Sequence, residues 1–367
     1  MKLKKIVTTM FFTCISMSGF ALEFDKPIAA QVILNQQGNL AATTTTKFVQ
    51  LMNLKLTQAE RRQFTTFHSF NPDQFRSSDD LPTKVELGMN NTPVLDQGQH
   101  GSCVTFANTA ALDALIGKGD YVSQLCSLAV GSYMSEYGYF PSGWEGSLGG
   151  MVVNQLLQLG IIDKATQRSK TCGGLSEYPL DAAEVGKPMS LEEYKALSIN
   201  LNQNIWYRPI MTVSDRLSWG TWAEGFGLAP ETADILKRVK ESLAKKPYPL
   251  DLKSAGRLTF AVLLPVDFCS AGACGSNKAH FDTWVLSDAM KKMTEGTLAG
   301  HEMVITGYDD EATVTDEDGQ IHKGLLKLRN SWGTKAGDQG DYYMTYEFFC
   351  QFVLEVQQLI WISGPEK

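Results

Sequence analysis

The sequence has no excess of positive charge, because 40 aspartates and glutamates outnumber 33 lysines and arginines and give a formal net charge of −7. Nucleic acids and anionic membrane surfaces bind basic patches, so this balance argues against either as a partner. The sequence has only 5 histidines among 367 residues, which limits the side chains that can serve as a base near neutral pH. We find no internal repeat and no cofactor site, and therefore expect no cofactor.

Long apolar segments are absent except for residues 6–20, which follow the basic sequence MKLKK. Gly19 and Ala21 then stand at the −3 and −1 positions of a cleavage site. This order is typical of a secretory signal, and the run is too short to be a good membrane-spanning helix; the alternative is an N-terminal core element. We expect residues 1–21 to be removed and the mature protein to be secreted, either outside the cell or into a periplasm.

Cysteine is sparse, and one of the 7 cysteines, Cys14, lies within the predicted signal. An oxidising compartment favours disulfides among the others. If one thiol must stay free, two bridges and one odd cysteine remain. The candidates are Cys103, Cys126, Cys172, Cys269, Cys274 and Cys350.

Residues 22–80 are predicted to form a hairpin followed by a helix. Two β-prone runs flank the turn sequence NQQGN, and Thr57 and Glu60 have the spacing of a capping box. Residues 70–82 are polar and are predicted to be an exposed linker. One hairpin and one amphipathic helix are too little to fold alone, so this segment must pack on the main domain.

The rest of the chain changes from helices to strands. Helices are predicted at residues 103–116, 151–159 and 231–244, the last begun by Pro230. Strands are predicted at residues 258–264, 301–308, 324–329 and 342–348. Helices first and strands later indicate an α+β protein with a helical side and a sheet side.

Cys103 stands at the predicted start of a helix, a position that lowers the pKa of a thiol. A thiol nucleophile also needs a base, a group that orients the base and a donor for the oxyanion. His301 lies at a predicted strand and Asn330 follows the next one, so adjacent strands can bring them together. The alternatives are a structural role for Cys103 and His280 as the base, although His280 has no apolar strand after it.

Three blocks in this order resemble the papain-like cysteine peptidases: DQGQHGSC at residues 96–103, GHEMVITGY at 300–308 and RNSWGTKAGDQGDYYM at 329–344. The resemblance extends over residues 81–367. It implies a two-lobed α+β fold, in which an active-site cleft separates a helical lobe from an antiparallel β-barrel-like lobe.

The resemblance also implies the roles of individual residues. Cys103 would be the nucleophile, His301 the base and acid, Asn330 the residue that orients His301, and Gln97 the oxyanion donor. The positions implied to contact substrate, or to cover the site in the case of the tryptophan, are Gly149, Gly150, Met151, Ala299, Gly300 and Trp332. Met151 could equally belong to the core.

The cysteines follow the family only in part. The resemblance implies a Cys126–Cys172 bridge, and we expect a local bridge between Cys269 and Cys274. Another family disulfide has lost both cysteines, since His100 and Ser147 stand in their places. We expect His100 to fill the space that this bridge has vacated.

Two further departures concern the cleft and the length of the chain. Val104 and Ala336 replace family tryptophans, which predicts a remodelled leaving-group side. An insertion is expected around residues 180–230, on the surface. His301 as a zinc ligand is excluded because no second histidine has the required spacing, and we expect no metal site.

These features predict a secreted, monomeric cysteine endopeptidase that hydrolyses protein or peptide substrates. Residues 22–80 would be a pro-segment that inhibits residues 81–367 as part of the same chain. The alternative is a secreted papain-fold binding protein with little or no turnover.

Overall fold

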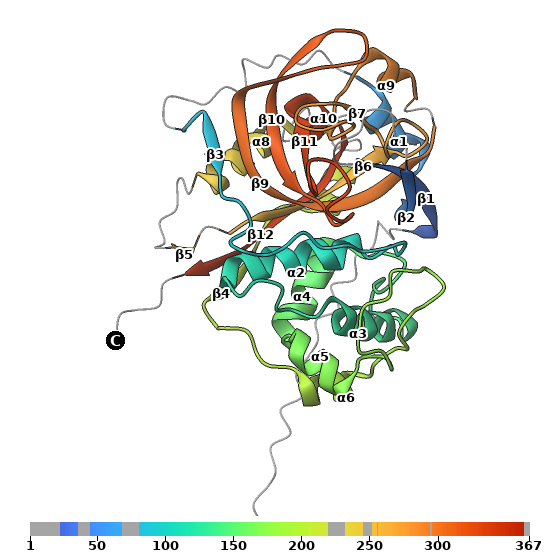
Figure 1. Ribbon diagram of the computed structural model, residues 1–367, viewed down its shortest axis with the longest axis vertical. Helices are drawn as coiled ribbons and strands as arrows, with labels where there is room; N and C mark the ends of the chain where they lie inside the picture. Colours follow the sequence, from blue (N-terminus) through green and yellow to red (C-terminus); the bar gives the residue numbers. More distant parts are fainter. Residues whose placement is uncertain are drawn as a thin grey trace, which may run out of the picture.

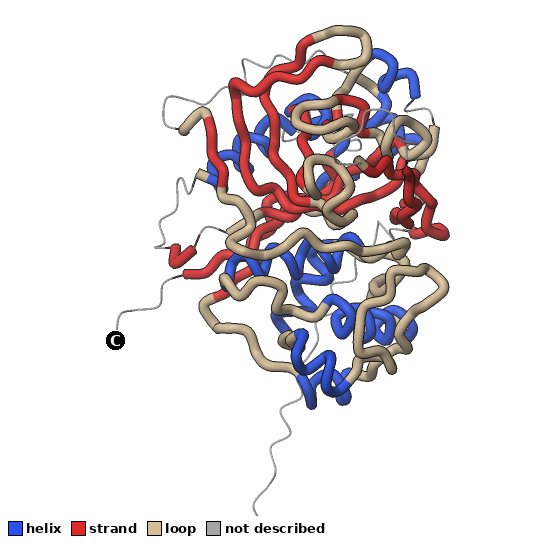
Figure 2. The backbone as a smooth tube through the Cα atoms, in the orientation of Figure 1, coloured by secondary structure: helices blue, strands red, loops and turns tan. Residues whose placement is uncertain are grey.

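The computed structural model describes residues 23–35, 45–67, 81–218, 232–244, 252–254, 256–293 and 296–362. Some predictions lie outside these residues. They concern the signal, the turn of the hairpin, most of the linker, and the end of the expected insertion at residues 219–230, which includes Pro230. The described elements form a helical lobe and a sheet lobe (Figure 1), and the strands gather mainly in the sheet lobe, which also carries helices (Figure 2). The predicted α+β class is confirmed.

The helical lobe is built around one buried helix. Its helices are α2 (Cys103–Ile116), α3 (Gln124–Glu136), α4 (Gly149–Leu159), α5 (Lys164–Lys170) and α6 (Leu191–Leu197). Every residue of α2 from Cys103 to Leu115 is buried, as in a helix at the centre of a fold. The helix ends at Gly117, whose φ of 69° is the left-handed conformation that glycine adopts readily. The predicted bounds of α2 are confirmed.

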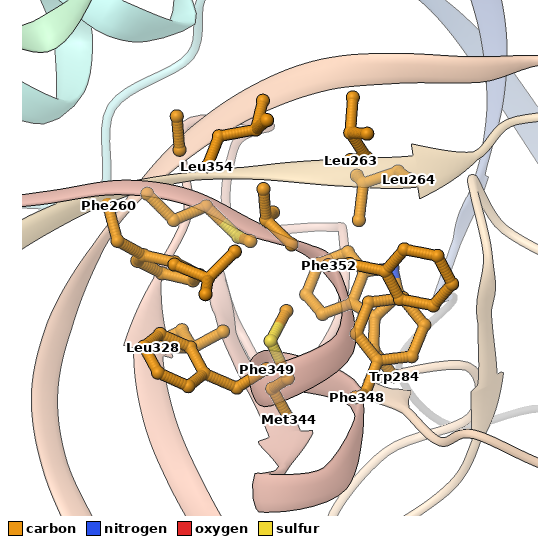
Figure 3. Packing of buried hydrophobic residues seen from close by; sticks show 14 of the residues in the cluster. Phe260, Leu263, Leu264, Trp284, Leu328, Met344, Phe348, Phe349, Phe352 and Leu354 are labelled. Carbon is orange, nitrogen blue, oxygen red and sulfur yellow. The ribbon is translucent and has the colours of Figure 1, made fainter. Parts of the chain in front are cut away.

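The sheet lobe has the strand order β4-β12-β6-β9-β10-β11-β8-β7. The strands are β3 (Lys84–Glu86), β4 (Ile205–Met211), β5 (Leu252–Ser254), β6 (Leu258–Pro265), β7 (Ala273–Gly275), β8 (Thr283–Trp284), β9 (Leu298–Thr315), β10 (Ile321–Arg329), β11 (Asp341–Thr345) and β12 (Val353–Ile362). Helices α8 (Thr232–Leu243), α9 (Asp288–Met293) and α10 (Tyr346–Phe352) accompany them. Aromatic side chains from the sheet and from α10 fill the core, among them Phe260 and Phe349 with ring centroids 5.6 Å apart (Figure 3).

Three predictions on this lobe need correction. The strand expected at residues 342–348 ends at Thr345, because the Thr345 hydroxyl accepts the Phe348 N–H and begins α10. The strand expected at residues 301–308 is the middle of the 18-residue strand β9. The expected surface insertion also contributes to the core, since β4 pairs with β12 and buries Ile210.

The N-terminal segment forms a hairpin and a helix as predicted, but the second strand, expected at residues 40–46, is described at 45–54. Strands β1 (Phe24–Leu34) and β2 (Thr45–Leu54) pair antiparallel, and α1 (Gln58–Thr65) begins with the capping box of Thr57 and Glu60. The hairpin lies on the sheet lobe close to the junction of the lobes (Figure 1). Strand β2 pairs with β9 through Met52 and Gly300.

None of the helices in the described residues is long and apolar enough to cross a membrane.

A buried ion pair fixes α8 to strand β9. Lys240 Nζ lies 2.7 and 2.9 Å from the two carboxylate oxygens of Asp310, and the Tyr346 hydroxyl donates to the same carboxylate at 2.6 Å. The Lys240 and Asp310 side chains are each only 2% exposed. Removing one member of such a pair leaves a buried charge without compensation.

We therefore expect Lys240→Met to lower the free energy of unfolding by about 3–5 kcal/mol, measured by urea denaturation. The matched control is Lys84→Met, which breaks the ion pair between Lys84 and Asp309. The Lys84 side chain is 60% exposed. That control should change stability little, because surface ion pairs contribute little. Equal midpoints for Lys240→Met and the parent chain would contradict this account.

Candidate active site

Cys103 is the first residue of α2, and its thiol is free and fully buried. Burial raises the pKa of this thiol to about 12, and the backbone N–H of Glu302 offsets only part of the effect. The sequence predicted a lowered pKa from the start of the helix. That prediction is wrong for this conformation, because loss of hydration outweighs the helix dipole.

His301 and Asn330 meet as expected. His301 Nε2 lies 2.8 Å from Asn330 Oδ1, and both side chains are buried. His301 is on β9, and Asn330 directly follows β10, the strand next to β9. Burial lowers the pKa of His301 to about 4, although the contact with Asn330 acts in the opposite direction.

The hydrogen bonds of Asn330 determine the tautomer of His301. Asn330 Oδ1 also accepts the Ser331 N–H at 2.8 Å, which identifies this atom as the carbonyl oxygen. A carbonyl oxygen only accepts, so His301 Nε2 carries the proton and Nδ1 holds a lone pair. This Nδ1 is buried and has no hydrogen-bond partner. The imidazole is therefore a neutral base with its acceptor nitrogen unused.

Trp332 covers the histidine ring. Its indole stacks on His301 with centroids 4.7 Å apart and an interplanar angle of 25°. Trp284 and Tyr342 contact Trp332 edge-on from the core of the sheet lobe. An apolar ring in this position keeps water away from the His301–Asn330 hydrogen bond.

Gln97 is fully buried and connects the two lobes. Its Nε2 donates to the His100 carbonyl at 2.8 Å, and its Oε1 accepts the Ser331 hydroxyl at 2.7 Å. An amide NH₂ has two hydrogens, so one N–H remains to donate to an oxyanion.

The nucleophile and the base are not joined by a hydrogen bond among the described contacts of Cys103 and His301. The hairpin lies beside them instead. A side chain placed at Gly146 in the helical lobe would meet Met52, and one placed at Gly300 in the sheet lobe would meet both Met52 and Leu54. Met52 thus fills the space between Gly146 of the helical lobe and Gly300, the residue before His301, and it is only 2% exposed.

The predicted substrate positions divide into two groups. Gly300 and Ala299 lie on β9 beside the hairpin, and Met151 is half-buried against the large core. Gly149 and Gly150 differ from the expectation. The Gly149 N–H donates to Glu355 at 2.6 Å and is therefore not free to pair with a peptide, and a Cβ at Gly150 would lie 2.9 Å from the Tyr207 hydroxyl.

The position that meets the hairpin from the helical lobe is Gly146. Its φ of 136° lies outside the range of most other residues, and a Cβ there would lie 3.1 Å from Met52. The sequence pattern after Ser147 points to Gly149 and Gly150, whereas no motif marks Gly146.

His100 and His280 have the peripheral roles that were expected. His100 is buried, its Nε2 lies 3.0 Å from the Pro179 carbonyl, and its ring packs 4.7 Å from that of Trp144. Burial lowers its pKa, which keeps the ring neutral. His280 lies in an exposed turn, where its Nδ1 is 3.2 Å from the Ser276 hydroxyl. The histidine that contacts Asn330 is His301.

Both expected disulfides are present in the structure. Cys126 is bonded to Cys172, and Cys269 to Cys274, which leaves Cys350 buried and free. No group of three or more His, Cys, Asp or Glu side chains suited to a metal ion occurs in the described part of the chain.

Sequence reasoning missed the buried glutamates Glu302 and Glu355 behind Cys103. Glu302 follows His301 directly, and Glu355 lies in β12, a strand that we did not predict. A glutamate in the middle of an apolar strand pattern was the available signal, because acidic side chains are seldom fully buried.

Comparison with known proteins confirms the resemblance. Residues 277–359 match the family model described as the peptidase C1-like family, a stretch that contains His301, Asn330 and Trp332. Over this stretch the chain is similar to the peptidase C1-like family. A comparison with curated proteins returns no match.

Solved structures are similar at low identity. The proform of Amb a 11, a ragweed pollen cysteine protease, is 15% identical over 81% of this chain and 71% of its own, with a TM-score of 0.44. Xylellain from Xylella fastidiosa is 18% identical over 80% of this chain and 90% of its own, with a TM-score of 0.45. Digestive procathepsin L 3 of Tenebrio molitor is 16% identical over 77% and 71%, with a TM-score of 0.42.

The buried thiol predicts a low reactivity at neutral pH in the chain that retains its hairpin. With a pKa of about 12, only roughly one Cys103 in 10⁵ is a thiolate at pH 7. We expect iodoacetamide labelling of Cys103, in a Cys350→Ser chain followed by mass spectrometry, to be slow at pH 7. The rate should rise about tenfold per pH unit up to pH 10. A rate that is already maximal at pH 7 would contradict the buried, neutral state.

Proposed function

We propose that this protein is a secreted cysteine endopeptidase made as a zymogen. Residues 81–367 form the peptidase, and residues 22–80 form its inhibitory pro-segment. The observation that carries the proposal is the His301–Asn330 hydrogen bond beneath Trp332, which leaves the unprotonated Nδ1 without a partner beside a helix that begins with Cys103.

In the proposed reaction His301 Nδ1 takes the Cys103 proton, and the thiolate attacks the carbonyl carbon of the scissile peptide bond. The oxyanion accepts hydrogen bonds from the unused N–H of Gln97 and from the Cys103 backbone. The imidazolium then gives its proton to the leaving amine, and water, activated by His301, hydrolyses the thioester. Asn330 keeps the ring in one orientation and one tautomer throughout these steps.

The contacts of the hairpin support its role as an inhibitor. Met52 occupies the space between Gly146 and Gly300, where β2 adds to the edge of β9 as an extended peptide would. The other strand is fixed on the opposite side of the site, where the Asn35 N–H donates to Lys335 at 2.7 Å and Leu34 pairs with Ala336. A substrate cannot occupy this space while the hairpin holds it.

The small residues around Met52 also suggest which substrates fit. Gly146 and Gly300 leave room for a long, unbranched apolar side chain, and Ala299 and Met151 lie nearby in the same hydrophobic core. We propose that the peptidase prefers such a side chain in its substrates at the position that Met52 fills.

Removal of the pro-segment should release the activity. A protease site inserted within residues 70–80 allows the same preparation to be assayed with a fluorogenic peptide before and after cleavage. We expect an increase of at least a hundredfold, because binding of the hairpin and binding of substrate exclude each other. Equal activity before and after separation of the segment would rule out the zymogen.

Loss of the Met52 side chain should weaken inhibition without cleavage. We expect the uncut Met52→Gly chain to gain about ten- to a hundredfold in peptidase activity, since burial of a methionine contributes about 2 kcal/mol or more to docking. Phe48→Ala is the matched control, because Phe48 lies on the same strand but is 55% exposed. A similar gain in both variants would show that the effect is not specific to the cleft.

The alternative, a papain-fold binding protein with little turnover, is favoured by one observation: burial keeps Cys103 neutral and apart from His301. An epoxide inhibitor of cysteine peptidases separates the two functions. The peptidase predicts one label per processed chain, absent from Cys103→Ala; a processed chain that takes no label supports the binding protein.

A further inference from the structure

Two buried glutamates lie in one row of the sheet behind the candidate active site. Glu302 on β9 pairs with Ala261 on β6, and Ala261 pairs with Glu355 on β12. Residues paired in this way point to the same face of a sheet. The small Ala261 therefore separates two carboxyl groups that face the helical lobe, and both side chains are almost fully buried.

Glu355 caps helix α4 from the other lobe. Its Oε1 accepts the Gly149 N–H at 2.6 Å, at the first residue of this 11-residue helix. A carboxyl group at a helix N-terminus satisfies backbone donors that the helix itself leaves unpaired. Gly149 has no space for a Cβ, because Gln357 and Glu302 fill it. The start of α4 is thus fitted closely onto the glutamate pair.

Glu302 binds helix α2 through a side chain. Its Oε1 accepts the Asn108 side-chain amide at 2.7 Å, and Asn108 lies in the helix that begins with Cys103. The Asn108 carbonyl in turn accepts the Thr259 hydroxyl at 3.0 Å and the Gln357 amide at 3.2 Å. The second oxygen, Oε2, is buried and has no partner. Two buried carboxyl groups therefore connect the second turn of α2 and the first residue of α4 to the sheet.

The charge of this pair is not neutralised by a cation. Neither carboxyl group forms a salt bridge in the described part of the chain. The ionisable groups that face the pair are the Cys103 thiol on α2 and the Tyr207 phenol on β4, both of which are neutral near pH 7, with His301 next to Glu302 along β9. Burial raises the pKa of Glu355 to about 7, and burial together with the Glu355 charge raises the pKa of Glu302 further above its usual range.

We propose that Glu302 and Glu355 are positioning residues that share one proton and dock α2 and the start of α4 on the sheet. Through this docking they set where Cys103 lies relative to His301. The inference rests on the proposed peptidase function. It implies that the active enzyme needs a proton on the glutamate pair, in addition to the proton shared by Cys103 and His301.

The proton shared by Glu302 and Glu355 determines how docking of the lobes depends on pH. While the pair holds it, only one of the two buried carboxyl groups is charged, and the lobes stay docked. When it is lost, two carboxylates repel each other across Ala261, and Cys103 moves from its position. In the folded chain Glu355 keeps its proton up to about pH 7, whereas in the unfolded chain it loses it above about pH 4.5, so stability should fall as the pH rises from about 4.5 to 7. The proton on Glu302 is lost only at a higher pH.

The test uses the chain processed after residue 80 and the variants Glu302→Gln and Glu355→Gln. Glutamine keeps the acceptor for Asn108 or Gly149 and removes the second charge, so both variants should fold. In the parent enzyme kcat/KM should fall on the alkaline side as the pair titrates. In both variants we expect that limb to move up by about one pH unit or more, with KM little changed.

Asp113→Asn is the matched control. Asp113 is a buried carboxyl near the other end of α2; its pKa is raised to about 8, and it accepts the Tyr121 and Val122 N–H groups. If its replacement moves the limb as far as the glutamine variants do, or if those variants keep the parent profile, the proposal is overturned.

A second measurement does not depend on turnover. The melting temperature of the uncut Cys103→Ala chain should fall between about pH 4.5 and 7, and this fall should be smaller when Glu355→Gln is added. An identical fall in both chains overturns the shared proton. A chain without peptidase activity that still shows the difference would refute the proposed function and retain the glutamate pair.

Discussion

The packing of helix α2 across strand β9 is the constraint on which the rest of the structure depends. Three successive residues of β9 perform different tasks at this contact. Gly300 receives the hairpin, His301 meets Asn330 and Trp332, and Glu302 anchors the helix that begins with Cys103. A one-residue shift of this strand would exchange its two faces and separate all three from their partners. The long strand, paired on both sides by β6 and β10, prevents such a shift.

The same contact explains why Cys103 and His301 are both neutral in this structure. Burial makes the thiol and the imidazole neutral, because an ion pair in an apolar space needs close mutual contact to offset its lost hydration. The hairpin places Met52 between the lobes, against Gly300, the residue before His301. Its release would admit water and substrate, and would favour transfer of the proton from Cys103 to His301. The proposed inhibition by the hairpin would therefore have an electrostatic part as well as a steric one.

The sequence predicted what is local or carried by motifs. The bounds of α2, the capping box at Thr57 and the meeting of His301 with Asn330 each follow from short patterns. What it missed depends on distant partners. The pKa of Cys103 depends on burial by other elements, and strand β12 was hidden by polar residues such as Gln357, which pair with the helical lobe. The cleft position of Gly146 became visible only through its contact with Met52.

The protonation state of His301 before and after release of the hairpin tests the central claim most directly. Nuclear magnetic resonance of ¹⁵N-labelled histidine reports this state at each ring nitrogen. In the uncut chain the account predicts a neutral ring with the proton on Nε2 at pH 6, since the pKa is about 4. After removal of residues 22–80 it predicts an imidazolium at the same pH that disappears in Cys103→Ala. A ring that stays neutral in the processed chain with Cys103 intact would contradict the account.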